Sequence, residues 1–310
     1  MWLTPEDCRI EDFRTVVEQT TDPGDYPHAE AVDQNVLIYG SDLPADRRAL
    51  QAEWVRAFTE GPGVVVFRGA FDPGVVDRAT AVFRQMIDDQ KAAGVAGGDH
   101  FAKPGANDRI WGALDKFAVR DPAAFAAYYA NETLAAVSEA WLGAGYQVTS
   151  QINVVNPGGQ AQVAHRDYHL GFMSRPQAQA FPVHAHLLSP ALTLQGAVAH
   201  VDMPVETGPT LYLPHSQKYP AGYLAFHQPE FTDYFDGHRV QLPLRKGDAA
   251  FFNPALFHGA GTNHSSAVRR MANLLQVSSA FGRAMESVDR TAMLLALYPA
   301  LRELADDGAA

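Results

Sequence analysis

A change of pattern begins at Tyr146-Gln147-Val148-Thr149-Ser150-Gln151-Ile152-Asn153-Val154-Val155 and at the turn that follows it, Asn156-Pro157-Gly158-Gly159. From this point to about residue 280, short runs rich in β-branched and aromatic residues alternate with Pro and Gly. Many short strands separated by turn signals are typical of a β-sandwich or barrel. The sequence therefore predicts a mainly β fold with a jelly-roll core.

The other expected strands of this core have the same make-up. They are Val183–Leu188, Leu192–Asp202, Thr210–Leu213, Arg239–Leu244, Ala249–Phe252 and Met271–Ser278. Outside the core, apolar residues at helical spacing predict four helices and one buried strand. The helices are Ala45–Thr59, Pro73–Gln90, Asp121–Leu142 and Arg290–Leu304, and the strand is Val64–Phe67. We expect a single domain, residues 1–310, in which a helix-rich part (1–145) packs on the core (about 146–280) and a helix (about 288–304) closes the chain.

Charge and cysteine content exclude several classes of protein. The chain has 24 basic and 35 acidic residues and a formal net charge of -11. No run of Lys and Arg offsets this charge, so we expect no nucleic-acid partner. The single cysteine, Cys8, rules out a disulfide within the chain and a cysteine-based metal cluster. The first residues do not resemble a signal peptide, and no run of 18 apolar residues occurs, so we expect a cytoplasmic protein without a membrane span.

Two separated segments carry metal-binding residue types. His165 and Asp167 are two positions apart, and such residues point to the same face of a strand. His258 follows much later, after Gly247-Asp248-Ala249-Ala250-Phe251-Phe252. Two histidines and one carboxylate on one face of an iron ion leave three coordination positions open, as oxygenases require.

Other histidines fit the same spacing. His200-Val201-Asp202 repeats the His-x-Asp pattern, and His184-x-His186 is a further pair. His165 is favoured because a Pro-Gly turn precedes it. His200 lies in a long apolar run, where a hydrogen-bonded core histidine is the usual explanation, although it could also line a pocket. Spacing alone does not choose among the three pairs.

A basic residue follows His258 at a distance that suits a second anionic ligand. Arg269 lies eleven positions after His258, and Arg270 is its rival. A guanidinium can hold a carboxylate with two parallel charge-assisted hydrogen bonds. Strand alternation allows only one of the two to face inward. The positions that alternate with Arg269 are slightly more apolar, which favours Arg269.

Several ordered motifs together resemble the phytanoyl-CoA dioxygenase family of Fe(II)- and 2-oxoglutarate-dependent oxygenases. In order they are Ile152-Asn153 before the Pro-Gly turn, His165-x-Asp167, Glu206-Thr207-Gly208-Pro209, Pro214-His215-Ser216-Gln217, Lys246-Gly247-Asp248, and His258-Gly-x-Gly-x-Asn263 with Arg269 beyond it. The family usually has His at the position of Gln217. The resemblance covers about residues 146 to 280.

The resemblance implies a double-stranded β-helix, the cupin-like form of the jelly roll. It also implies that His165, Asp167 and His258 bind Fe(II), that Arg269 binds the distal carboxylate of 2-oxoglutarate, and that Asn153 hydrogen-bonds this cosubstrate. His200-x-Asp202 is then disfavoured, because it lies too close to the Glu206-Thr-Gly-Pro motif.

The implied activity is hydroxylation, or another oxidation, of an unactivated C–H bond of a small metabolite by O₂. Succinate and CO₂ are released. Relatives that halogenate have a small residue in place of the acidic ligand, so Asp167 favours hydroxylation or a related oxidation.

Residues on the substrate side are expected near the ligand segment and on one loop. Tyr168, His169 and Phe172 follow the ligands and could shape the pocket, as could His200. The stretch from residue 99 to 111 mixes Gly, Pro, charge and aromatic residues, a composition typical of a loop over a site. Lys103 and Arg109 in this loop are candidates for binding an anionic group of the substrate.

Two alternative functions remain. A cupin-type metal-dependent enzyme that does not use 2-oxoglutarate would keep the three ligands and have no use for Arg269. A non-catalytic β-sandwich binding module would have structural histidines and no iron affinity. The sequence carries no signal of oligomeric state.

Overall fold

The computed structural model describes residues 1–44, 46–94, 105–160, 162–169 and 171–306. An eight-stranded sheet forms its centre. In spatial order the strands are β1 (Ala31–Asp33), β2 (Val36–Tyr39), β3 (Val64–Phe67), β9 (Ala249–Phe252), β6 (Thr193–Ala199), β11 (Arg270–Ser278), β5 (Gln147–Val155) and β4 (Asn107–Ile110). Neighbouring strands are antiparallel except β2 and β3. Long-range pairing of this kind joins segments from both halves of the chain.

A smaller sheet faces the large one. It consists of β10 (Phe257–Ala260), β7 (Thr210–Leu213) and β8 (Val240–Gln241), in that order. Apolar side chains from both sheets form one buried cluster, in which Tyr212 of β7 meets Phe252 of β9. Two facing sheets with such a filling have the layout of a jelly roll.

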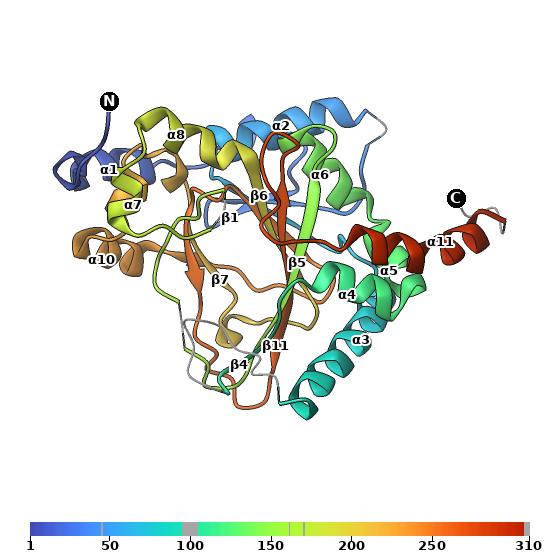
Figure 1. Cartoon of the computed structure of the whole chain (residues 1–310). Coiled ribbons are helices and arrows are strands. Elements are labelled where there is room, and N and C mark those ends of the chain that lie inside the picture. The colour runs from blue at the N-terminus through green and yellow to red at the C-terminus, as the bar shows by residue number, and fades with distance from the viewer. Residues whose placement is uncertain (45, 95–104, 161, 170, 307–310) are drawn as a thin grey trace.

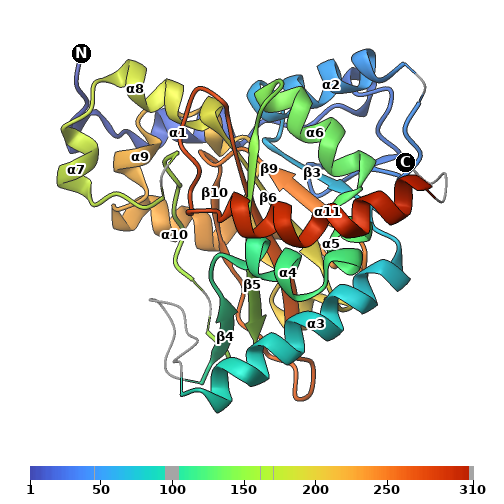
Figure 2. The ribbon, with the colours of Figure 1, turned by 45° about the vertical axis from the view of Figure 1, so that its right-hand side comes forward.

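Helices cover the outer face of the large sheet. They are α2 (Arg47–Thr59), α3 (Pro73–Ala92), α4 (Ala113–Arg120), α5 (Pro122–Tyr129) and α6 (Glu132–Leu142), and α11 (Arg290–Asp306) lies across α4 and α5 (Figure 2). Residues that alternate along the strands, such as Val65 and Phe67, pack against Trp54 and other helix residues. The main apolar core therefore lies between this sheet and its helices.

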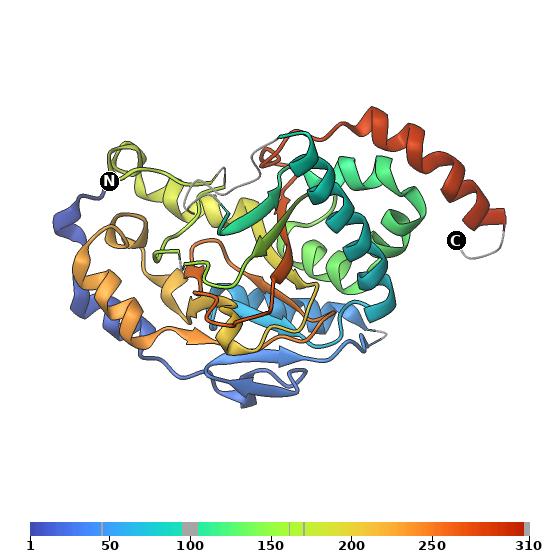
Figure 3. The ribbon, with the colours of Figure 1, turned by 90° about the horizontal axis from the view of Figure 1, so that it is seen from below.

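A second helical layer covers the small sheet. It contains α1 (Ile10–Val17), α7 (Arg175–Gln179), α9 (Gly222–Ala225) and α10 (Pro229–His238), with α8 (Val183–Leu188) beside them. Phe13 of α1 lies against the rings of Tyr219, Phe231 and Phe257. Figures 1 and 3 show the sheets between the two helical layers, with the N-terminus and helix α11 on opposite sides of the molecule. Short 3-10 helices span Pro5–Asp7, Pro23–Asp25, Ser189–Leu192, Val205–Thr207 and Ser216–Lys218.

Local sequence explains where the helices begin. Asp72 accepts hydrogen bonds from the backbone N–H groups of Gly74 (2.8 Å) and Val75 (3.0 Å), and Pro73 occupies the first turn of α3. Asn131 caps α6 in the same way, through Leu134 N–H. Such caps satisfy backbone donors that have no partner within the helix.

Most of the expected elements are confirmed. The strands form the centre of the molecule, although helices hold 43% of the described residues and strands 21%. The expected strand Val183–Leu188 is wrong, because these residues form α8 after Pro182, with Leu187 and Leu188 exposed. The expected helix Asp121–Leu142 is two helices, broken before the cap residue Asn131.

The boundary expected near residue 145 does not separate the sheet. Strands β1 to β4, which precede it, pair with each other and with β9 and β5. The single domain stays a prediction. Within the described part of the chain, no helix has both the length and the apolar character needed to cross a membrane.

Candidate metal centre

Three buried side chains converge between the two sheets. One ligand atom each of His165, Asp167 and His258 can be chosen so that all three lie within 4.8 Å of one another. His258 Nε2 is 3.7 Å from Asp167 Oδ2, and the centroids of the two imidazole rings are 4.3 Å apart. The fold therefore brings together the three residues that the sequence predicts as metal ligands.

The small sheet holds all three residues. His258 belongs to β10, and its N–H and C=O exchange hydrogen bonds with the backbone of His165 (3.1 and 3.0 Å). The N–H of Asp167 donates to Pro254 O at 2.9 Å. His165 and Asp167 thus lie on a short segment that extends the edge of the small sheet, and Arg166 between them points to the opposite side.

Both imidazole rings are oriented by their own backbone. His165 Nδ1 donates to Val163 O and His258 Nδ1 donates to Leu256 O, each at 2.9 Å. A carbonyl oxygen can only accept, so each Nδ1 carries the proton and each Nε2 keeps a lone pair for a metal. Burial, with His165 close by, lowers the pKa of His258 to about 4. The imidazole is therefore neutral at neutral pH, as a metal ligand must be.

The carboxylate of Asp167 has one satisfied and one unsatisfied oxygen. Oδ2 accepts a close hydrogen bond from Gln195 Nε2. Oδ1 is buried and has no hydrogen-bond partner among the described residues. An unpaired buried carboxylate oxygen is costly unless a cation binds it. The donor set, two imidazoles and one carboxylate, fits a divalent transition metal with open positions.

A cavity of about 390 Å³ opens from these three residues. Its walls come from the inner faces of β4, β5, β6 and β11 and from the small sheet. Seven of its polar or charged lining residues apart from the ligands are Arg109, Gln151, Asn153, Gln162, Gln195, Gln276 and Arg270. Among the lining residues that the structure describes, Asp167 is the only carboxylate.

Arg270, and not Arg269, faces this cavity. Arg270 is 6% exposed and lines the cavity together with Ala272 and Gln276 of the same strand. Arg269 points outward, where it binds Asp108 Oδ2 at 2.7 Å with a side chain that is 53% exposed. The prediction that Arg269 faces inward is wrong, because the more apolar face of β11 packs under the helices while the more polar face lines the cavity.

The guanidinium of Arg270 has no hydrogen bond or ion pair with any other described residue. Burial lowers its pKa to about 10, so it remains charged at neutral pH. Asn153 lies on the neighbouring strand β5 and lines the same cavity. A buried cation that no described residue pairs with, at the wall of a cavity that also holds a metal-ligand set, is suited to a small anion.

The expected substrate residues divide into two groups. Arg109 and Phe172 line the cavity, and Phe172 lies edge-on to the His165 ring at 4.9 Å. Arg109 belongs to strand β4, so the expected loop from residue 99 to 111 ends in a strand that pairs with β5. Lys103 lies outside the described residues.

Tyr168 and His169 were expected at the cavity, and the structure turns both away from it. The Tyr168 hydroxyl contacts His186 Nδ1, and its ring stacks on Tyr223 at 4.1 Å. His169 Nδ1 lies 2.7 Å from Thr193 Oγ1, and its Nε2 accepts from the backbone N–H of Arg283. These contacts bury or satisfy the polar atoms of both residues. His184 and His186 lie on helix α8, where residues two apart diverge.

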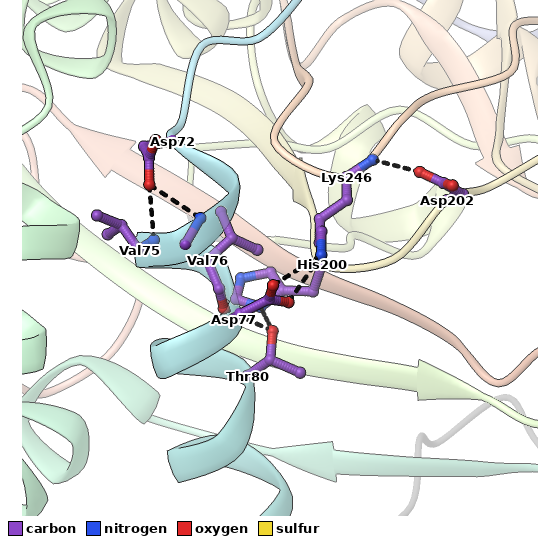
Figure 4. A network of polar contacts seen from close by, with 9 residues as sticks. Asp72, Val75, Val76, Asp77, Thr80, His200, Asp202 and Lys246 are labelled. Carbon is purple, nitrogen blue, oxygen red and sulfur yellow. Dashed lines mark hydrogen bonds and ion pairs between the residues drawn. The ribbon is translucent and has the colours of Figure 1, made fainter.

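His200 is a core histidine on the far face of the large sheet. Its Nδ1 lies 2.8 Å from Thr80 Oγ1 on α3 (Figure 4). Its Nε2 lies 2.9 Å from the Tyr128 hydroxyl. Burial lowers its pKa to about 3, so the ring is neutral. Asp202 instead accepts a hydrogen bond from Lys246 N–H. The expectation that His200 lines the pocket is wrong, because strand alternation turns it to the helical side.

Sequence reasoning missed Gln195, Gln151 and Gln276. Each is a glutamine inside a strand, next to a leucine or an isoleucine, and each lines the cavity. A long polar side chain in a buried strand was the signal that could have found them.

Solved structures share the fold of this chain. The non-haem α-ketoglutarate-dependent carbocyclase SnoK from nogalamycin biosynthesis has a TM-score of 0.52 and 21% identity, over 76% of this chain and 87% of that one. AviO1 from Streptomyces viridochromogenes Tue57 has a TM-score of 0.53 and 17% identity, over 78% and 98%. HygX from Streptomyces hygroscopicus, solved with nickel, 2-oxoglutarate and hygromycin B, has a TM-score of 0.52 and 16% identity, over 74% and 87%. These similarities confirm the expected double-stranded β-helix.

No curated protein sequence matches the chain. The model of the family described as phytanoyl-CoA dioxygenase (PhyH) matches residues 59–271. This match includes the three metal-ligand candidates and Arg270, and it begins well before the motifs that carried the resemblance. The chain belongs to the phytanoyl-CoA dioxygenase family.

Proposed function

We propose that this protein is an Fe(II)- and 2-oxoglutarate-dependent oxygenase. It hydroxylates, or otherwise oxidises, an unactivated C–H bond of a small metabolite and releases succinate and CO₂. The observation that carries the proposal is the buried guanidinium of Arg270, which has no partner among the described residues and lines the same cavity as His165, Asp167 and His258. Family membership supports the same activity.

His165, Asp167 and His258 would hold the iron. Their two lone-pair nitrogens and the unpaired carboxylate oxygen form one face of a coordination sphere, and the remaining positions face the cavity. Once bound, iron and 2-oxoglutarate would supply the chemistry that activates O₂ for oxidation of the substrate. The protein orients the ligands and excludes water, since all three ligand residues are 6–7% exposed.

Arg270 would hold the distal carboxylate of 2-oxoglutarate. Its charge is buried, so the ion pair would form in an environment that screens it weakly. A guanidinium can donate two parallel hydrogen bonds to a carboxylate, which also orients the bound molecule. Asn153 on the adjacent strand would hydrogen-bond the same cosubstrate.

The rest of the cavity would bind the substrate. A volume of about 390 Å³ lies near the lower end of the range for small-molecule sites, roughly 300–1,000 Å³, which supports a small metabolite. Phe172 and Arg109 are the proposed substrate contacts. Phe172 lies beside a metal ligand, and the Arg109 guanidinium stacks 4.4 Å over the Trp111 ring at the same wall.

An anaerobic titration tests the proposal. Metal-free protein receives Fe(II) and then 2-oxoglutarate while the visible spectrum is recorded, with His258→Ala as the matched variant. We expect a metal-to-ligand charge-transfer band in the wild type and none in the variant. Bound iron without a band would favour a cupin-type enzyme that does not use 2-oxoglutarate. No bound iron would favour a binding module.

A further inference from the structure

Gln195 connects the large sheet to the metal-ligand segment. It lies on β6, is 3% exposed and lines the cavity. Its Nε2 donates to Asp167 Oδ2, and within the described part of the chain no other side chain donates to this carboxylate. The three ligand candidates are all held by the small sheet, so this hydrogen bond crosses the space between the sheets.

The orientation of the Gln195 amide follows from its partner. A carboxylate accepts hydrogen bonds and repels a carbonyl oxygen, so Nε2 must point to Asp167 and Oε1 must point away. Oε1 is buried and has no hydrogen-bond partner in the regions that the structure describes. The amide therefore cannot flip without leaving both the carboxylate and one of its own N–H groups worse satisfied.

The chemistry of an amide suits this position. A lysine or arginine would form an ion pair with Asp167 and compete with a metal for its negative charge. A neutral N–H donor restricts rotation of the carboxylate and leaves its charge available. Partners of this kind orient metal ligands, and their loss typically weakens metal binding by roughly 10- to 100-fold.

We propose that Gln195 is a positioning residue that fixes the Asp167 carboxylate in the orientation that binds the metal. The proposal rests on the proposed function, because it requires a metal at His165, Asp167 and His258. Gln195 acts through Asp167 and needs no contact with the metal itself. Its effect should therefore vanish when Asp167 is removed.

The chain offers a matched control. Gln276 lies directly opposite Gln195 in the β11–β6 register and lines the same cavity. Its side chain makes no hydrogen bond to any of the three ligands within the described structure. Gln195→Met and Gln276→Met remove the same amide from neighbouring positions and preserve side-chain length.

The experiment is a Co(II) titration of the full chain, followed by visible absorption, with thermal unfolding as a check of folding. We expect Gln195→Met to weaken Co(II) binding by roughly 10- to 100-fold and to shift the absorption band, and Gln276→Met to stay within about twofold of the wild type. In an Asp167→Ala background, Gln195→Met should change the residual affinity by less than about twofold.

Three outcomes would overturn the proposal. These are wild-type affinity in Gln195→Met, equal losses in both glutamine variants, and an undiminished effect of Gln195→Met without Asp167. A wild type that binds no Co(II) would overturn the metal centre and this proposal together. A wild type that binds Co(II) but shows no charge-transfer band with Fe(II) and 2-oxoglutarate would sink only the proposed function.

Discussion

Replacing each of two adjacent arginines by leucine, in separate variants, tests the cosubstrate site most directly. Arg270→Leu removes a buried guanidinium that faces the cavity, whereas Arg269→Leu removes one that is 53% exposed and paired with Asp108. A hydrogen bond to a charged group contributes about 1.5–3 kcal/mol. Loss of two such bonds costs at least about 3 kcal/mol, so Arg270→Leu should bind 2-oxoglutarate roughly 100-fold more weakly.

The same change should have the opposite effect on the folded protein. Burial moves the pKa of Arg270 from 12.5 to about 10, which corresponds to about 3 kcal/mol of destabilisation by the charged group at neutral pH. Arg270→Leu should therefore be at least as stable as the wild type in the absence of ligand. A structural role would instead lower the free energy of unfolding.

Arg269→Leu is expected to change little. Asp108 also pairs with Lys91 at 2.8 Å, so the loss should stay within about 1 kcal/mol of stability. The assay is the anaerobic titration of Fe(II)-loaded protein with 2-oxoglutarate, followed by the charge-transfer band, beside urea unfolding. Loss of affinity in Arg269→Leu with full affinity in Arg270→Leu would refute the assignment of the inward residue.

Three further predictions concern the pKa of His200, the packing at Gly222 and the metal centre. The pKa of His200 is about 3 in the folded protein, and the pKa of a free histidine is 6.5. Between these values His200 binds a proton only in the unfolded chain, so the folded protein loses stability as the pH falls below 6.5. From pH 7 to pH 5 urea unfolding should show a loss of about 2 kcal/mol that His200→Gln lacks; equal losses would contradict this. Gly222→Ala should destabilise the protein by about 2 kcal/mol, because a Cβ at this position would lie 1.9 Å from Arg166 Cζ. Gly237→Ala should stabilise it slightly, because a Cβ there meets no atom within 4 Å. Thermal unfolding that ranks the two variants in the opposite order would contradict the packing argument. Ni(II) at 100 times its dissociation constant should raise the free energy of unfolding by about 2.7 kcal/mol, and persistence of this rise in Asp167→Ala would count against the metal centre.

Pattern alone was enough for the elements with strong local signals. Residues 73–92 form a helix because Asp72 and Pro73 start it and apolar residues recur at helical spacing. Residues 147–155 form a strand because β-branched residues alternate there up to a Pro-Gly turn. The segment Val183–Leu188 was mistaken for a strand, since six residues with few charges carry no clear period and tertiary packing decided the outcome.

The sequence also predicted which residues form the candidate metal site and the order in which they occur. His165, Asp167 and His258 carry the right ligand atoms in the order that the family motifs require, and the structure brings them within 4.8 Å. Spacing alone did not exclude His200-x-Asp202, because the same His-x-Asp pattern occurs at two places in the chain. The fold separates them, since one pair faces the cavity and His200 faces the helices.

What the sequence determined by itself was the set of chemical groups, their order, and the two faces of each strand. Only the tertiary structure decided which face meets the helices and which meets the cavity. Alternation shows that Arg269 and Arg270 point in opposite directions, but the apolar face of β11 is the one buried under helices, so the polar face and Arg270 line the site. The contact between Gln195 and Asp167 joins residues on different sheets, and no local pattern encodes it, because sheet-to-sheet packing alone brings them together.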